Sequence, residues 1–362
     1  MTMAAPREVA CGAEAAVGMA TRRGATRPLS VAPMVGHTDR HFRRMMRFIT
    51  RRTLLYTPML APQAVLREGH LVAMDAAERP VALQLGGSDP TLVARAARVA
   101  WQAGFDEVNL NLGCPSDAAS DGRYGACLML EPALVQDILR AMREAVPIPV
   151  TAKIRLGVDD HDGEEDVFAW VDALTDAGVD RLIVHARKAF LTGLDPKQNR
   201  TIPPLRYPLV HAIKARHPTL WVELNGGLKS LAQAREHLAG LDGAMIGRAA
   251  LDDPYLFARA DRDVFGVDPP ATARTPEAVV QAFVPYAASA LGDGEPLARI
   301  ARGLLTLFNG RPGARAWRQV LSTELPRAGA DVRVLERALE AWRAAAVHGR
   351  HRGAEGVDDE AP

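Results

Sequence analysis

Short apolar runs rich in Val, Ile and Leu recur along the chain from Leu29, and longer stretches with helical spacing separate them. The runs with the length of strands span residues 29–34, 54–59, 81–87, 107–113, 150–156, 181–186, 221–226 and 243–248. Helices are predicted at about residues 38–51, 61–69, 89–103, 131–145, 164–178, 206–217 and 230–239, with another after Asp252. Eight strand-then-helix units over about 220 residues predict a (β/α)₈ TIM barrel rather than a doubly wound sheet.

The alternation of strands and helices ends near residue 266, and only helical spacing continues beyond it. We therefore expect a barrel over residues 28–266 and a small helical domain over residues 267–347. Residues 1–27, rich in Ala, Gly and Arg, are expected to form a disordered extension rather than a secretory signal. Residues 348–362, which end in a cluster of acidic side chains, are expected to form a disordered tail.

The composition, with 48% hydrophobic and 24% charged residues, is that of an ordinary soluble globular protein. A formal net charge of +1 indicates no nucleic-acid or membrane binding by the chain as a whole. Residues 271–352 nevertheless carry twelve Lys and Arg against seven Asp and Glu, so the helical domain is locally basic. No apolar run approaches the ~18 residues of a membrane helix. The three cysteines form no CxxC pair, which argues against a disulfide framework or a zinc site and favours a reducing cytoplasm.

In such a barrel the active site lies at the carboxyl ends of the strands, where this chain has many polar residues and glycines. These are Ala32-Pro33-Met34, Gln84, Asn109, Asn111, Cys114, Lys153, Arg155, His185, Arg187, Asn225-Gly226-Gly227 and Gly247-Arg248. Each alone has a structural explanation, such as an amide that satisfies nearby backbone or a buried core histidine. A purely structural role is less easily assigned to Lys153, because a lysine in an apolar strand must lose its charge or pair with an anion. Their convergence on one mouth predicts a ligand site.

Glycines after the last two predicted strands indicate that this ligand carries a phosphate. Asn225-Gly226-Gly227 precedes a helix that begins near Ser230, and Gly247-Arg248 follows the next strand. Glycine lets the backbone approach a phosphate closely, and N–H groups at a helix start are good donors. A phosphate held by the loops after strands seven and eight recurs in these barrels.

Cys114 follows the predicted fourth strand, within the segment Val108–Ser116. A lone cysteine is more often a small buried hydrophobic residue, but a thiol in a loop after a strand is also placed for chemistry. A thiol with a reference pKa of about 8.5 is mostly protonated at neutral pH and can act as a general acid. Cys127 is the other candidate thiol, although a buried structural role is favoured for it.

These motifs resemble those of the tRNA-dihydrouridine synthases, and most closely the branch called dihydrouridine synthase A. The segments that carry the resemblance are Ala32–Met34 with Thr38-Asp39, Pro80–Gly87, Asn109–Ser116, Lys153–Arg155, His185–Lys188, Pro196–Arg200, Asn225–Gly227, Gly247-Arg248 and Pro312–Arg318. The resemblance covers about residues 29–345 and implies an FMN enzyme that reduces the C5=C6 bond of uridine in tRNA. NADPH would recharge the flavin, and the targets would be positions 20 and 20a of the D-loop.

The resemblance also implies roles for single residues. FMN would be bound by Ala32, Pro33, Met34, Gln84, Lys153, His185, Asn225, Gly226, Gly227, Gly247 and Arg248. Cys114 would protonate C5 after hydride transfer from the flavin to C6, and Asn111 would contact the target uridine. Further tRNA contacts are expected from Lys197 and Arg200 in the loop after strand six, and from Arg311, Arg315 and Arg318. The last three, interleaved with Trp317 on one helix, would supply a backbone grip and a stacking surface for a base that leaves the RNA fold.

Two alternatives remain open at this point. One is an FMN-dependent reductase of small pyrimidines or dihydroorotate, against which the basic helical domain counts. The other is a flavin-free tRNA-binding scaffold, against which the intact set of Gln84, Lys153, His185 and Cys114 counts. In each case we expect a cytoplasmic monomer that holds no metal.

Overall fold

The computed structural model describes residues 26–116, 119 and 121–354. Most of the expected N-terminal extension and the last part of the expected tail therefore lie outside the described residues. Arg27 was expected to belong to the extension, but its guanidinium Nη2 lies 3.2 Å from Asp106 Oδ1 and so packs against the barrel.

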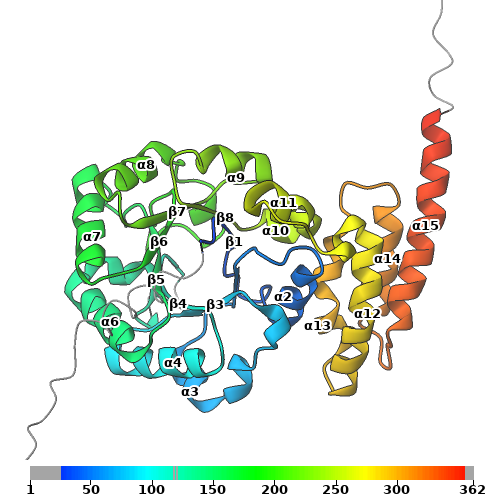
Figure 1. The fold of residues 1–362 in the computed structure, drawn as a ribbon, viewed down its shortest axis with the longest axis horizontal. Coiled ribbons are helices and arrows are strands. Elements are labelled where there is room, and N and C mark those ends of the chain that lie inside the picture. Colours follow the sequence, from blue (N-terminus) through cyan, green and yellow to red (C-terminus); the bar gives the residue numbers. More distant parts are fainter. Residues whose placement is uncertain (1–25, 117–118, 120, 355–362) are drawn as a thin grey trace, which may run out of the picture.

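Parallel strands form a closed barrel surrounded by helices, which confirms the predicted TIM-barrel fold (Figure 1). The strands are β1 (Leu29–Val31), β2 (Leu55–Tyr56), β3 (Val81–Leu85), β4 (Glu107–Leu112), β5 (Val150–Arg155), β6 (Arg181–His185), β7 (Trp221–Asn225) and β8 (Gly243–Ile246). Their order is β1-β8-β7-β6-β5-β4-β3-β2, and a parallel bridge between Ser30 and Leu54 joins the two outer members. Strand β2 is shorter than residues 54–59 because Pro58 has no N–H to donate to the next strand.

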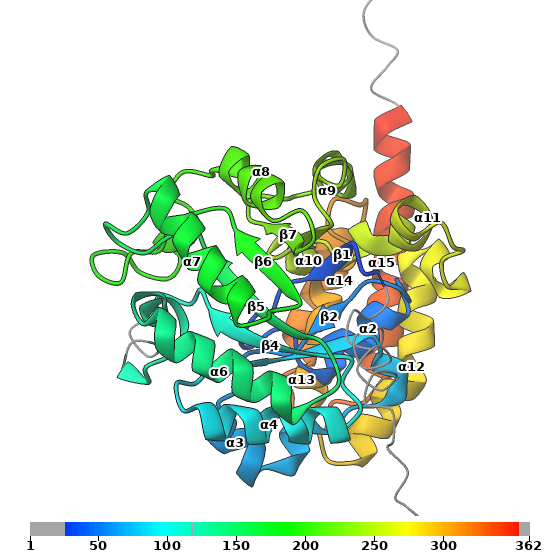
Figure 2. The ribbon, with the colours of Figure 1, turned by 60° about the vertical axis from the view of Figure 1, so that its left-hand side comes forward.

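Helices alternate with the strands and cover the outside of the barrel (Figure 2). They are α2 (Arg40–Arg47), α3 (Pro62–Arg67), α4 (Pro90–Gln102), α6 (Pro132–Ala145), α7 (Glu164–Asp176), α8 (Tyr207–Arg216), α9 (Leu231–His237), α10 (Ala249–Asp252) and α11 (Ala260–Phe265). Helix α4 illustrates why the pattern predicted them: Asp89 accepts a hydrogen bond from the Leu92 N–H at its start. Its buried residues, among them Val93, Ala97 and Ala100, follow the helical period and face the strands.

The helical domain lies beside α2 at one side of the barrel (Figure 1). It contains α12 (Pro276–Gly292), α13 (Leu297–Ile300), α14 (Ala314–Glu324) and α15 (Arg333–Ala354). The fully buried Trp317 packs at 4.6 Å between ring centroids against Phe308 and donates to the Leu304 carbonyl at 2.8 Å. Helix α15 continues to Ala354, so it passes residue 347, where we expected the domain to end.

Hydrogen bonds tie the helical domain to the first loop of the barrel mouth. Arg302 Nη1 donates to the Gly36 carbonyl at 2.6 Å. His41 Nδ1 lies 2.8 Å from the Tyr286 hydroxyl, so helix α2 contacts α12 directly. The loop that follows β1 is therefore held by both domains.

Polar side chains fill part of the barrel interior and run from its amino-terminal end toward the mouth. Alternate residues of a strand face the same side, so Glu107, Asn109 and Asn111 form an inward row on β4. Asn109 Nδ2 donates to Thr151 Oγ1 at 2.8 Å, and Thr151 Oγ1 donates to Glu107 Oε1 at 2.7 Å. Arg181 Nη1 then lies 3.5 Å from Glu107 and 3.7 Å from Glu223. We call this set the interior chain: Gln84, Asn109, Thr151, Glu107, Arg181 and Glu223.

Candidate active site at the mouth of the barrel

Strand register brings the predicted polar residues to one level at the carboxyl end of the barrel. Gln84 pairs with Asn109, Asn111 with Lys153, and His185 with Asn225 in adjacent strands. Gln84 Nε2 donates to Asn109 Oδ1 at 2.8 Å, and Asn111 Nδ2 donates to Gln84 Oε1 at 3.2 Å. The amide row is thus fixed by its own hydrogen bonds.

The loop that carries Cys114 is held rigidly against the ends of β4 and β5. Asn111 Oδ1 accepts hydrogen bonds from the N–H groups of Gly113 at 3.0 Å and Cys114 at 3.1 Å. Arg155 Nε donates to the Gly113 carbonyl at 2.9 Å. Gly125, with φ of +79°, closes the other side, where an added Cβ would lie 2.4 Å from the Cys114 carbonyl oxygen. The half-buried thiol is therefore preorganised, with its sulfur 3.3 Å from Ser116 Oγ.

Cys127 has a different environment from Cys114. Its sulfur donates to the Tyr124 carbonyl at 3.2 Å, and burial raises the pKa of its thiol. It lies in the 3₁₀ helix Gly125–Leu130, packed against the hydrophobic core. The partly buried thiol of Cys127 is thus engaged by the main chain.

Lys153 presents an unpaired ammonium group at the mouth. Burial, with the nearby charge of Arg155, lowers the pKa of Lys153 to about 7. Its Nζ makes no hydrogen bond and no ion pair with any described residue. A cation held in this way is stabilised by an anionic ligand.

His185 has a buried ring nitrogen that lacks a partner. Nε2 makes no hydrogen bond among the described residues. Burial first, and then the charges of Arg155 and Lys153, hold the pKa of His185 well below its ordinary value, so the ring is neutral at pH 7. Buried polar atoms without a partner are rare in proteins, so His185 Nε2 points to a bound ligand.

The glycine turn after β7 forms a surface that side chains would fill. Gly226 and Gly227 have φ of +110° and +76°. An added Cβ at Gly227 would lie 2.5 Å from the Tyr207 hydroxyl, and that hydroxyl donates to the Gly226 carbonyl at 2.8 Å. Asn225 Nδ2 donates to the Met245 carbonyl at 2.9 Å and so ties β7 to β8. Both positions therefore require glycine, because the packing of Tyr207, Leu205 and His185 and the positive φ values exclude a larger residue.

The remaining predicted cofactor residues line the same mouth. Ala32 is buried, Pro33 is half-buried, and Met34 is half-buried against the Thr38 hydroxyl, which accepts from its N–H at 3.0 Å. Gly247 leads into the exposed Arg248, whose Nη2 donates to the Arg200 carbonyl at 3.3 Å.

The loop after β6 is organised by residues whose role the sequence did not reveal. Arg155 Nη1 donates to the Asn199 carbonyl at 2.7 Å. The Asn199 side chain is fully buried and bonds to both the N–H and the carbonyl of Phe190. Arg187 Nη1 donates to the carbonyls of Thr201 and Pro203. These bonds leave Lys197 and Arg200 exposed on the loop beside the mouth.

In the helical domain, the arginine motif is only partly as expected. Arg315 and Arg318 are exposed on α14, but Arg311 precedes that helix, and its guanidinium lies 4.6 Å over the Tyr255 ring. The expectation that Trp317 offers a stacking surface was wrong, because its ring is completely buried. Trp317 lies on the same face of α14 as the buried residues Ala314 and Leu321, and this face packs into the helical domain.

Among residues 26–116, 119 and 121–354, no group of three or more His, Cys, Asp or Glu side chains is arranged to hold a metal ion. In the same described part of the chain, no helix is both long enough and apolar enough to cross a bilayer.

The fold and the sequence are both similar to those of known proteins. A solved 2-naphthoyl-CoA reductase complex aligns with a TM-score of 0.52 at 11% identity, over 64% of this chain and 49% of its own, which supports the fold alone. The tRNA-dihydrouridine(20/20a) synthase of Synechocystis is 48% identical over 87% of this chain and 95% of its own length. The enzyme of the same name from Escherichia coli K12 is 48% identical over 86% of this chain and 90% of its own. Residues 30–343 match the family described as dihydrouridine synthase (Dus). The chain therefore belongs to the dihydrouridine synthase family.

Proposed function

We propose that this chain reduces the C5=C6 bond of uridines 20 and 20a in the D-loop of tRNA, with FMN as cofactor and NADPH as electron donor. One observation carries the proposal: relatives 48% identical over 90–95% of their own length are named tRNA-dihydrouridine(20/20a) synthases. The family is flavin-dependent. We further propose that the protein acts as a monomer in the cytoplasm.

The residues at the mouth fit a flavin. The unpaired ammonium of Lys153 and the orphaned Nε2 of His185 suit the polar edge of the isoalloxazine ring. The turn of Gly226 and Gly227 would bring main-chain N–H groups close to its phosphate, because it follows β7 and carries no side chains. The full set that would hold FMN is Ala32, Pro33, Met34, Gln84, Lys153, His185, Asn225, Gly226, Gly227, Gly247 and Arg248.

Reduction of uridine needs a hydride at C6 and a proton at C5. When bound, the reduced flavin supplies the hydride, and its electrons come from NADPH. Cys114 donates the proton to C5 from its thiol and regains one from solvent. The hydrogen bonds from Asn111 and Arg155 to this loop hold the sulfur where a base inserted into the mouth can meet it.

The uridine must leave the tRNA fold to enter the mouth. Asn111 Oδ1 is already used by the loop of Cys114, and one amide N–H donates to Gln84 Oε1. Asn111 would therefore contact the base through its other N–H, in exchange for the weak contact of Nδ2 with Met59 Sδ at 3.1 Å. Lys197 and Arg200 on the loop after β6 would contact the phosphates near this base. Arg311, Arg315 and Arg318 would extend the contact onto the helical domain.

The test compares tRNA from cells that lack this protein with tRNA from cells in which it is restored. We expect dihydrouridine at positions 20 and 20a to disappear and return, and the purified protein to be yellow and to release FMN. NADPH and NADH are compared as reductants of the purified protein.

Two outcomes would favour the alternatives. A yellow protein that reduces small pyrimidines but leaves tRNA unmodified would be the small-molecule reductase. A colourless protein that binds tRNA would be the flavin-free scaffold.

A further inference from the structure

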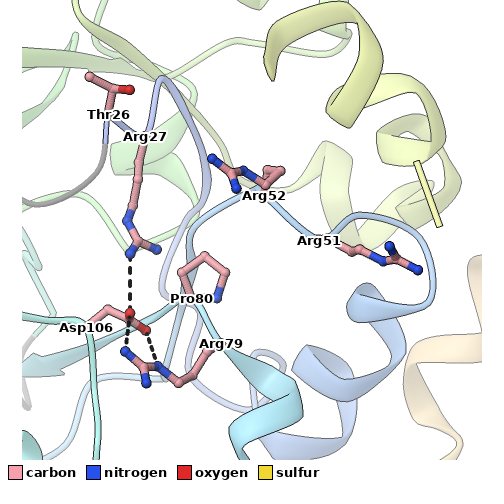
Figure 3. A pocket seen from close by; sticks show the side chains of 7 residues that line it. All are labelled: Thr26, Arg27, Arg51, Arg52, Arg79, Pro80 and Asp106. Atoms are coloured by element: carbon pink, nitrogen blue, oxygen red, sulfur yellow. Dashed lines mark hydrogen bonds and ion pairs between the residues drawn. The ribbon is translucent and has the colours of Figure 1, made fainter. Parts of the chain in front are cut away.

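A cavity of about 330 Å³ lies at the amino-terminal ends of the strands, the pole of the barrel opposite the mouth. Figure 3 shows the side chains that line it. Its lining residues directly precede four strands, and amino-terminal strand ends face away from the catalytic end. They are Thr26 and Arg27 before β1, Arg51 and Arg52 before β2, Arg79 and Pro80 before β3, and Asp106 before β4. The lining thus holds four guanidinium groups and one carboxylate.

Asp106 does not neutralise this charge. Its Oδ1 lies 3.2 Å from Arg27 Nη2 and 2.9 Å from Arg79 Nη2, so two cations share one anion (Figure 3). Its Oδ2 also accepts the Val81 N–H at 2.9 Å, which leaves the carboxylate fully used. The acid next along the chain, Glu107, is engaged by Tyr56 and by the interior chain.

Several donors around the cavity have no partner among residues 26–116, 119 and 121–354. Arg27 Nη1 is buried and makes no hydrogen bond among the described residues. The Arg52 side chain makes no hydrogen bond or ion pair in the described part of the chain, although its N–H is anchored on Asp261 Oδ1 at 3.1 Å. In Figure 3 the Arg51 guanidinium points away from Asp106. The donors left for a ligand are Arg27 Nη1, the Arg52 guanidinium and Arg79 Nη1, since the other nitrogens of Arg79 donate to Asp106.

A fifth arginine adds positive charge behind the cavity. Arg47 is buried, and its Nη2 donates to the Pro80 carbonyl at 2.7 Å. Arg47 forms no ion pair with the described residues. The wall of the cavity therefore carries positive charge before any ligand binds.

We propose that this cavity binds a small anion with two phosphate groups. Guanidinium groups match phosphate oxygens in pairs, and three of them around one space exceed what a single phosphate needs. The volume lies in the range of small-molecule sites. The position argues against RNA as the source of the phosphates, because a tRNA whose base enters the mouth docks on the other pole.

The test is a calorimetric titration of the full-length, flavin-loaded protein with inorganic pyrophosphate. Bound flavin keeps pyrophosphate out of the glycine turn at the mouth. We expect one saturable site per chain, and Arg52→Gln should weaken binding at least about tenfold through the loss of a charge-assisted contact. Pyrophosphate should also raise the melting temperature of the parent protein and raise that of the variant less at the same concentration.

Arg98→Gln is the matched control, because it removes the same charge from the exposed face of α4, outside the cavity. It should bind pyrophosphate like the parent. Arg52→Lys, which keeps the charge, should retain part of the affinity. The proposal is overturned if pyrophosphate does not bind or if Arg52→Gln binds it normally. It is also overturned if tRNA displaces pyrophosphate and loses affinity in the same variant, since the phosphates would then be those of RNA.

Discussion

The side-chain oxygen of Asn111 accepts a hydrogen bond from the main-chain N–H of Cys114 at 3.1 Å. The residue expected to contact the substrate therefore also shapes the loop that holds the proposed acid. Its amide nitrogen lies 3.2 Å from Gln84 Oε1, so the thiol loop and the amide row form one unit. A change at Asn111 would disturb both proton donation and the cofactor edge.

Cys114→Ala should keep flavin and tRNA binding but slow turnover by ~10²-fold or more, the usual contribution of a general acid. The measurement is oxidation of the pre-reduced enzyme after mixing with tRNA. Cys127→Ala is the control, because that thiol donates to the Tyr124 carbonyl and should not be needed for proton transfer. Normal turnover in Cys114→Ala would remove Cys114 as the acid.

Lys153→Met should lose flavin yet stabilise the flavin-free protein at low pH. The pKa of Lys153 is lowered to about 7 by burial, so its charge destabilises the fold fully below pH 7. Between pH 7 and pH 10.5 Lys153 is neutral in the folded state but still protonated in the unfolded state. The destabilisation caused by its buried charge therefore decreases as the pH rises through this range. The gain at pH 6 is bounded by about 5 kcal/mol, since one pKa unit corresponds to 1.36 kcal/mol.

Denaturant unfolding of the flavin-free Lys153→Met variant and parent at pH 6 and pH 9 measures this gain. A gain of the same size at both pH values would contradict a buried charge as its source. Full flavin loading of the variant would separate Lys153 from the cofactor.

Gly227→Ala should abolish flavin retention. The new Cβ would meet the Tyr207 hydroxyl at 2.5 Å, and φ of +76° is strained for alanine. Gly266→Ala is a matched control, because Gly266 has φ of +66° with open space around it at the end of α11. Gly266→Ala should lose about 1 kcal/mol of stability through its positive φ alone, and Gly227→Ala should lose more because of the added clash. Only Gly227→Ala should be colourless. Equal flavin content in the two would exclude the turn from the phosphate site.

Arg315→Ala should weaken tRNA binding. It should also reduce the slope of log K against log salt concentration by about one, the change expected for the loss of one phosphate contact. Arg315 is exposed at the start of α14 on the basic domain. Arg140→Ala, on the exposed face of α6, removes an equal charge away from that domain and serves as control. Binding is measured at several salt concentrations, and parallel slopes for Arg315→Ala and the parent would place Arg315 outside the interface.

Much of the fold follows from the sequence, because strand and helix periods differ and the barrel tolerates only one arrangement of eight such units. The polar strand ends also identified which residues meet at the mouth. The spacing did not reveal that Trp317 is buried, since a basic helix can pack on either face. Nor did it reveal the anchoring of the loop after β6 by Arg155 and Asn199, because those bonds join segments far apart in the chain. The cavity around Arg52 was missed since single arginines before strands look like ordinary surface residues.

The interior chain has a genetic consequence. Asn109 donates to Thr151, and Thr151 donates to Glu107. Replacing one of these residues therefore leaves a buried neighbour without its hydrogen-bond partner. In a saturation library selected for a folded, yellow protein, single replacements at these positions should be depleted. Joint replacement of Glu107, Arg181 and Glu223 by apolar residues should destabilise the fold less than removal of Arg181 alone, because no charge is then left unpaired in the barrel. The hydroxyls of Tyr56 and Thr151 would still lose their acceptor. Substitutions in the interior chain are therefore expected to be tolerated in combination rather than singly.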